Sequence, residues 1–307
     1  MRFAPWTLRF HKHVHFCGCR LKPRAPFRAG RGGTVNLASN LRKVAAFFWR
    51  DFAIARGYRG ALLFETIEAL FGVATFYYLS RFVQSPELSS ELPAGANYFA
   101  FALVGFAFFD YLSVSLSAFD ASLEEARQNR TLEALLVTQT PLPVILAGSA
   151  IYPFVALAVR TCVYLAWGAL FFGFAPRSAN WPGAVVILLA SILAFAGLGI
   201  LSAGYSILFK RGNPAKWIVL GLSGLLGGMM YPVSVLPAPL QMLARLIPVT
   251  YSLEGMRGAL LAGAGWRELF PSIGALLLFA VILIPLSFAV FAWALRRTKI
   301  TGTLTHI

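Results

Sequence analysis

Six long apolar segments dominate this chain and limit what it can fold into. They cover roughly residues 60–82, 98–120, 143–174, 183–209, 217–236 and 271–295. A helix needs about 20 mostly apolar residues to cross the roughly 30 Å of hydrocarbon in a bilayer. No segment has the alternation of a barrel strand, and 58% of the residues are hydrophobic while only 13% are charged. The sequence therefore predicts an all-α integral membrane protein with six transmembrane helices.

Basic residues between these segments predict the orientation of the chain. With six spans, both termini lie on the same side as residues 36–59, 121–142, 210–216 and 296–307. Those segments hold thirteen Lys and Arg residues, whereas the opposite loops hold five. Because cytoplasmic loops of membrane proteins are enriched in Lys and Arg, we expect both termini in the cytoplasm.

Residues 1–35 differ in composition from the rest of the chain. They hold eight basic residues and no acidic ones, and they lack the apolar core of a signal peptide. We expect a disordered basic tail near anionic headgroups, or an extension that is not part of the native protein. Three His residues and the motif Cys17-Gly-Cys19 also occur here, but their spacing fits no common zinc pattern, so no metal site is predicted.

Residues 36–59 are predicted to form a cytoplasmic interfacial helix. Apolar residues recur at helical spacing for more than three turns, at Leu41, Val44, Ala45, Phe48, Phe52 and Ala55. Charged residues, most of them basic, occupy much of the other surface, which is typical of an amphipathic helix in the membrane interface. The alternative is the ordinary basic flank of the first span. The six-span membrane domain follows over residues 60–300.

The segment 231–270, on the predicted outer side, combines apolar residues with frequent prolines. The prolines are Pro232, Pro237, Pro239 and Pro248. They interrupt the segment too often for a span, yet it is too apolar for an ordinary exposed loop. Two short helices, about 238–246 and 250–262, that cap the bundle or dip into the outer leaflet would fit both features. A seventh and an eighth crossing are the alternative, although each piece is short for one.

The segment 123–141, LEEARQNRTLEALLVTQTP, lies between the second and third spans on the predicted cytoplasmic side. It predicts an amphipathic helix with a leucine stripe at Leu132, Leu135 and Leu136. The opposite face carries Glu124, Glu125, Arg127, Arg130 and Glu133. Its net charge is negative, against the trend of cytoplasmic loops. A protein partner explains such residues better than topology does.

This segment resembles the cytoplasmic coupling segment of type-2 ATP-binding-cassette (ABC) exporter permeases. That family has Gly-Thr-Leu-Glu, a Leu-Leu pair and a Thr-Pro ending. The matching residues here are Thr131-Leu132-Glu133, Leu135-Leu136 and Thr140-Pro141, with Arg130 in place of Gly. The outer segment is also similar to the family's region before the last span, at Tyr231-Pro232, Leu236-Pro237, Ile247-Pro248, Glu254 and Arg257. The resemblance covers about residues 36–300.

The resemblance implies partners for the chain. Such permeases work as two membrane subunits with two ATPase subunits, so a second permease copy or a homologue is expected, as well as contact with membrane lipids. The chain has no GxxxxGK[ST] phosphate loop. It is therefore expected to be a transport subunit and not an enzyme, with ATP and Mg²⁺ bound by the partner ATPase. The residues expected to contact that partner are Glu124, Glu125, Arg127, Thr131, Leu132, Glu133, Leu135 and Leu136. No nucleic-acid partner is expected, and the location is a bacterial or archaeal cytoplasmic membrane.

Four ionisable residues lie inside predicted spans, where charge is costly. They are Glu65 and Glu68 in the first span, Asp110 in the second and Arg160 in the third. They could form a polar pathway; alternatively, Asp110 and Arg160 neutralise one another between neighbouring helices. Small residues are expected to allow close helix packing in the fourth span, at Gly197, Gly199, Ala203 and Gly204, and in the fifth, at Gly221, Gly224 and Gly228.

Two other classes of function stay open, an ion-coupled secondary transporter and a membrane-embedded enzyme. The first usually shows internal repeats, and none is evident. The second needs a catalytic constellation, but the sequence has neither HExxH nor GxSxG. For an exporter, a lipid-linked saccharide and a hydrophobic or amphipathic compound are equally compatible substrates. The aromatic residues of the second span could line a path, but such residues more often pack the bundle or face lipid.

Overall fold

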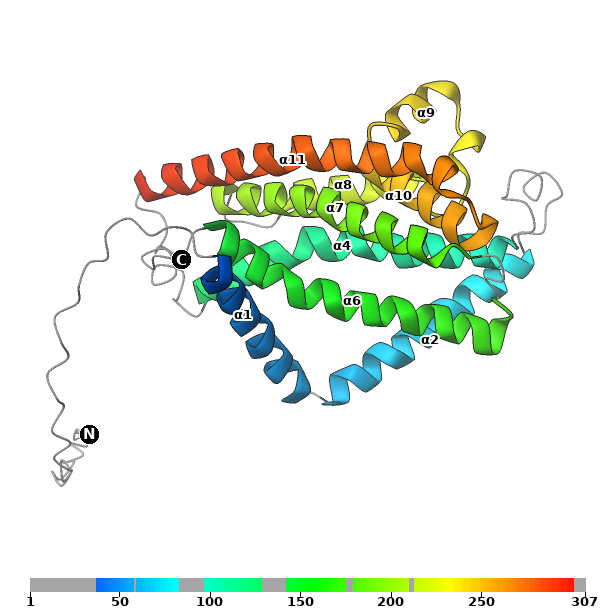
Figure 1. Cartoon of the computed structure of the whole chain (residues 1–307), viewed down its shortest axis with the longest axis horizontal. Coiled ribbons are helices and arrows are strands. Elements are labelled where there is room, and N and C mark those ends of the chain that lie inside the picture. Colours follow the sequence, from blue (N-terminus) through cyan, green and yellow to red (C-terminus); the bar gives the residue numbers. More distant parts are fainter. Residues whose placement is uncertain are drawn as a thin grey trace, which may run out of the picture. The chain divides into compact units, whose positions relative to one another are not determined.

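The computed structural model of the chain describes residues 37–57, 59–82, 97–128, 142–174, 179–209 and 213–300 (Figure 1). These described residues all belong to one compact unit. Every regular element in the described part is a helix, which confirms the predicted all-α class. The predicted tail over residues 1–35, with its His and Cys residues, lies outside the described residues, as does most of the predicted coupling segment.

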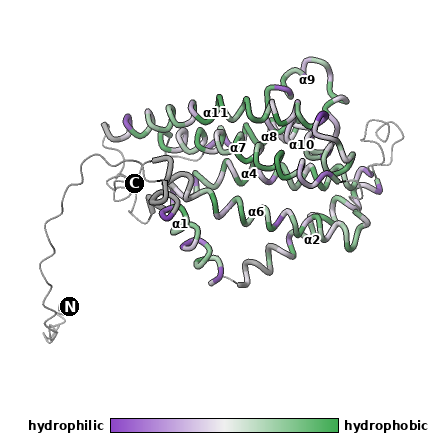
Figure 2. Tube along the Cα trace, in the orientation of Figure 1, coloured by the Kyte–Doolittle hydropathy of each residue, from purple (hydrophilic) through white to green (hydrophobic). Residues whose placement is uncertain are grey.

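Four of the described helices are long and apolar enough to cross a membrane. They are α4 (Tyr98–Gln128), α6 (Leu142–Phe172), α7 (Trp181–Phe209) and α11 (Trp266–Ile300). The shortest has 29 residues and is about 43 Å long at 1.5 Å per residue, so each exceeds the hydrocarbon thickness. Apolar residues run along most of their length (Figure 2). These helices coincide with four of the six predicted spans.

The other two predicted spans are not among these four helices. α2 (Arg59–Phe82) is a helix with nearly the bounds predicted for the first span. α8 (Pro214–Leu226) has 13 residues, too few to cross alone. Its predicted continuation to residue 236 is wrong, because the chain turns at Gly227 and Gly228, and Gly228 has φ +78°, a conformation that favours glycine. The six-span count stays a prediction.

α7 packs against both α4 and α11 in the bundle. Glycines permit this approach: a Cβ at Gly199 would lie 2.3 Å from the Ser115 carbonyl oxygen of α4. One at Gly197 would lie 2.7 Å from Leu283 Cβ of α11. The close helix packing predicted for Gly197 and Gly199 is therefore confirmed, whereas a Cβ at Gly221 of α8 would meet no atom of the described residues within 4 Å.

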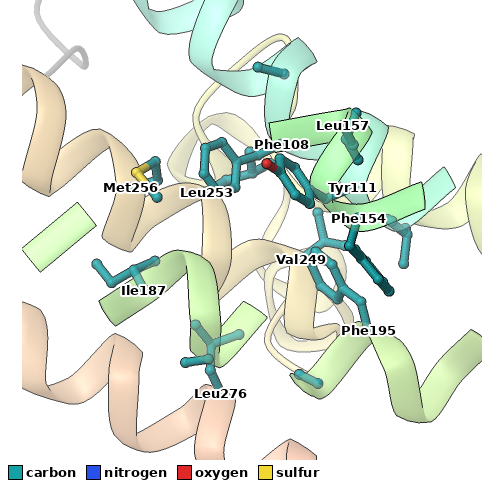
Figure 3. Packing of buried hydrophobic residues seen from close by; sticks show 14 of the residues in the cluster. Phe108, Tyr111, Phe154, Leu157, Ile187, Phe195, Val249, Leu253, Met256 and Leu276 are labelled. Atoms are coloured by element: carbon teal, nitrogen blue, oxygen red, sulfur yellow. The ribbon is translucent and has the colours of Figure 1, made fainter. Parts of the chain in front are cut away.

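Aromatic rings fill the space between α2, α4 and α6. The Tyr77 and Phe172 ring centroids are 4.8 Å apart, and the Phe106 ring lies 5.0 Å from Phe76 and 5.5 Å from Tyr164. Farther along α4, Phe108 and Tyr111 are buried in the same core; Figure 3 shows them beside Phe154 and Leu157 of α6. These positions support packing, rather than a path, as the role of the aromatic residues in the second span.

α1 (Leu37–Gly57) is a helix, as predicted for residues 36–59, and it packs against the beginning of α6. The Phe48 ring is 6.1 Å from that of Tyr152. Trp49 and Ile54 are more than half exposed. This apolar surface beside basic residues suits a membrane interface, although the location of α1 there stays a prediction.

The segment before α11 forms the short helices that the sequence predicts. They are η1 (Val233–Val235), α9 (Ala238–Ala244), α10 (Pro248–Arg257) and η2 (Gly258–Ala262). The predicted prolines set their starts: Pro232 and Pro237 immediately precede η1 and α9, and Pro248 is the first residue of α10. Leu253 and Met256 of α10 are buried near Ile187 of α7 and Leu276 of α11 (Figure 3).

The helix ends divide between the two ends of the bundle (Figure 1). α4, α7 and α11 finish at one end, where α6 and α8 begin; we name this the inner end, after the predicted orientation. α9 and α10 lie at the other, the outer end. The last turns of α4 and the start of α8 thus share one end, and α9 and α10 belong to the opposite one.

Candidate functional site

α4 continues past the predicted membrane boundary near residue 120 into the predicted coupling segment. Its last turns contain Glu124, Glu125 and Arg127, and the helix ends at Gln128. The Glu124 side chain is exposed. The remaining predicted contact residues lie outside the described residues; they are Thr131, Leu132, Glu133, Leu135 and Leu136. The second predicted span and the start of the coupling segment are therefore one continuous helix.

A polar cluster at the inner end joins α4 to α7 and to the start of α8. The Asp120 carboxylate of α4 accepts hydrogen bonds from Ser202 Oγ (3.1 Å) and Ser206 Oγ (3.1 Å) of α7. It also accepts one from Asn213 Nδ2 at 3.0 Å. Hydrogen bonds to an ionised acceptor are about twice as strong as neutral ones. We call these four residues the Asp120 cluster.

Asn213 also caps α8. Its Oδ1 accepts a hydrogen bond of 3.0 Å from the backbone N–H of Lys216, and Pro214 is the first helical residue. The Asp120 cluster was not predicted from the sequence. The Asn-Pro pair was a readable signal for the cap, but nothing in the sequence brings Asn213 to a carboxylate 93 residues away.

Three of the four predicted intramembrane ionisable residues meet between α2, α4 and α6. Arg160 Nη2 lies 3.2 Å from Glu68 Oε1, and Arg160 Nε lies 3.8 Å from Asp110 Oδ2. Arg160 Nε also donates a hydrogen bond of 2.5 Å to the Tyr164 hydroxyl. One guanidinium thus faces two carboxylates, the arrangement expected of a neutralised structural group. The Glu65 side chain lies outside the described part of the chain, and a role of the group in transport stays a prediction.

Arg257, predicted as part of the outer segment, is a buried cation at the end of α10, with 5% of its surface exposed. Its Nη1 donates a hydrogen bond to the Gly228 backbone oxygen (2.6 Å), and its Nη2 donates one to the Met229 backbone oxygen (2.7 Å). Nε and Nη2 also donate to the Phe101 backbone oxygen, at 3.2 and 3.1 Å. The guanidinium lies 3.4 Å from the Phe101 ring centroid. We call this set of bonds the Arg257 clamp.

The Arg257 clamp requires a glycine in α4. A Cβ at Gly105 would lie 2.2 Å from the Met229 oxygen and 2.5 Å from Arg257 Nη2. Burial lowers the pKa of Arg257 to about 9, so the side chain still carries its charge at neutral pH. The cation also stabilises the carbonyl end of α8, where the helix dipole is negative.

A polar cavity of about 460 Å³ lies at the outer end between η1, α9 and α10. It is lined by Val233, Ser234, Gln241, Arg245, Thr250, Tyr251 and Glu254. Burial raises the pKa of the Glu254 carboxyl, and the charges of Arg245 and Arg257 oppose that rise. The predicted residue Glu254 thus lines a recess that holds charges of both signs, while Arg257 points into the core.

Residues 42–261 match the family model described as ABC-2 type transporter. The chain is similar to the inner membrane transport permease YadH of Escherichia coli (strain K12), with 26% identity over 202 residues, 66% of this chain and 75% of that protein. It is also similar to nodulation protein J of Rhizobium meliloti (strain 1021), with 24% identity over 198 residues, 61% and 71% of the two chains.

The family match spans the elements described above. It begins in α1, includes the Asp120 cluster and the Arg257 clamp, and ends in η2. ABC-2 permeases work with an ATPase subunit, and the long apolar helices fit a multi-pass membrane protein. This chain belongs to the ABC-2 type transporter family and is a membrane subunit of an ABC transporter.

Proposed function

We propose that this chain is the permease subunit of an ATP-driven exporter in a bacterial or archaeal cytoplasmic membrane. The observation that carries the proposal is the continuity of α4, which runs from the outer end of the bundle into the coupling segment. A partner ATPase, which binds ATP and Mg²⁺, contacts the segment 121–142 from the cytoplasm. Its movement on ATP binding displaces α4 directly, because a helix transmits motion as a rigid element.

Two permease copies, or this chain and a homologue, enclose the transport path. Large side chains such as Phe108, Tyr111 and Phe195 fill the core of the single chain, which favours a path between two subunits over one through the bundle. The cargo is a lipid-linked saccharide or a hydrophobic or amphipathic compound that moves outward. Membrane lipids surround the apolar faces of α6, α7 and α11.

Reconstitution with the ATPase tests this proposal. The chain, copurified with its ATPase subunit in nanodiscs, should hydrolyse ATP faster when a glycolipid or an amphipathic drug is added. We expect Glu133→Lys to lower transport per ATP hydrolysed by about fivefold or more without affecting membrane insertion. Glu268→Lys, at an exposed position at the start of α11, is the matched control. Absence of an associated ATPase, or equal coupling in both variants, would contradict the proposal.

A further inference from the structure

The Asp120 cluster and the Arg257 clamp fasten α8 to α4 at both of its ends. At the inner end, Asp120 of α4 accepts a hydrogen bond from Asn213, the N-cap of α8. At the outer end, Arg257 donates both to the Phe101 oxygen of α4 and to the backbone just after α8. The 13 residues of α8 therefore lie between two polar attachments to one neighbouring helix.

The two attachments differ in what they can transmit. The Arg257 clamp is buried and holds backbone oxygens, so it fixes the outer end of α8. The Asp120 cluster is half-buried and consists of side chains, and it lies where α4 enters the coupling segment. α4 continues as a helix from Asp120 to Gln128, a little over two turns. Any displacement of that helix end must therefore move Asp120 or bend α4.

We infer that Asp120 is a positioning residue of the transport cycle, which passes movement of the coupling segment through Asn213 to the start of α8. Ser202 and Ser206 hold the same carboxylate against α7, so the inner ends of α4, α7 and α8 move together. The inference rests on the proposed function. A residue that merely stabilised the bundle would change its melting temperature and leave the response of α8 to ATP intact.

An exchange of side chains tests the inference. Asp120→Asn removes the carboxylate that accepts the hydrogen bond. Asn213→Asp removes the amide donor, so that two carboxylates face each other in place of the 3.0 Å hydrogen bond between Asn213 and Asp120. The double exchange Asp120→Asn/Asn213→Asp restores an amide–carboxylate pair in the opposite sense. Asp and Asn are equally good N-caps. The cap of α8 therefore survives both in Asn213→Asp and in the double exchange. Ser117→Ala is the matched control, because the Ser117 hydroxyl donates a hydrogen bond within α4, to the Ser113 oxygen.

A cysteine at Ile218, which is 60% exposed on α8, reports the movement. The native residues Cys17, Cys19 and Cys162 are replaced by serine. In the otherwise unaltered complex, vanadate trapping with ATP should change the rate of maleimide labelling at this cysteine by about fivefold or more. The control variant Ser117→Ala should show the same change. Each single exchange should reduce the change to less than about twofold, and the double exchange should recover most of it.

The outcomes separate the inference from the proposed function. An unaltered labelling response in both single variants overturns the role of Asp120 and leaves the exporter intact. Failure of the double exchange to recover the response, in a complex with a normal melting temperature and normal ATP hydrolysis, also overturns it. If Asp120→Asn does not fold, Ser206→Ala, which removes one donor, must weaken the response. A complex that neither retains an ATPase nor responds to ATP contradicts the proposed function itself.

Discussion

Arg257 is a buried cation that directs all of its hydrogen bonds to the backbone of other segments. Its fork of donors reaches three carbonyl oxygens that belong to α4 and to the turn after α8. Buried carbonyl groups without partners are costly, and the turn at Gly228 cannot satisfy its oxygens through a helix. The guanidinium therefore replaces the helical hydrogen bonds that end at Leu226.

Arg257→Lys should destabilise the fold although it keeps the charge. Lysine carries three donors on a flexible stem, whereas the planar arginine fork reaches separate acceptors at fixed angles. Because bonds from a charged donor contribute about 1.5–3 kcal/mol each, we expect the free energy of unfolding to fall by about 3–5 kcal/mol. Thermal unfolding followed by tryptophan fluorescence measures this. Arg267→Lys, at an exposed position in α11, should change little; equal losses would contradict the clamp.

The interaction partners of some charged residues could be predicted from the sequence, and those of others could not. Asp110 and Arg160 stood out because charge inside an apolar span needs a partner, and the two lie 3.8 Å apart. Asp120 did not stand out, because a carboxylate at the end of a span looks like an ordinary boundary residue. Its donors lie 82 to 93 residues away, so only the packing of α4 against α7 brings them together.

At the scale of elements, the glycines of α7 determine how closely it approaches its neighbours. Gly199 faces the α4 backbone, where an added Cβ would lie 2.3 Å from the Ser115 oxygen. Gly204, later in the same helix, faces α11, and a Cβ there would come no closer than 3.4 Å to the neighbouring atoms. The two positions share a helix and differ in available space.

We expect Gly199→Ala and Gly204→Ala to have opposite effects on stability. Gly199→Ala must push α7 away from α4, and such overpacking costs about 1–3 kcal/mol. Gly204→Ala fits, and alanine in a helix is favoured over glycine by about 0.5–1 kcal/mol. Melting temperatures of the two purified variants provide the comparison. A similar shift in both would mean that the bundle adjusts at Gly199 without strain.

The helix boundaries that the sequence missed have a common cause. The apolar segment 217–236 was predicted as one span because hydropathy does not show where the backbone changes direction. In the structure, the chain turns inside this segment at Gly227 and Gly228. The proline-rich segment was predicted well, since each proline marks a helix start that local chemistry dictates. Local rules therefore located α9 and α10, whereas the bonds that Arg257 makes to the Gly228 and Met229 oxygens after α8 come from a distant part of the sequence.

At the scale of the whole molecule, the alternation of helix ends brings the start of α8, with Lys216, to the same end as the last turns of α11, with Arg296 and Arg297 (Figure 1). α9 and α10 have 7 and 10 residues, each too short to cross a bilayer. They therefore favour an outer cap over a seventh and an eighth crossing.

Single cysteines at four exposed or partly exposed positions test this topology in a chain without native cysteines. Gln241→Cys in α9 and Arg267→Cys at the start of α11 should react in intact cells with a membrane-impermeant maleimide, because both belong to the outer end. Lys216→Cys at the start of α8 and Arg296→Cys late in α11 should react only after permeabilisation, since Lys and Arg favour the cytoplasmic side. Labelling of Arg296→Cys in intact cells would contradict a cytoplasmic C-terminus. Protection of Gln241→Cys, with Arg267→Cys still labelled, would place α9 inside the membrane rather than above it.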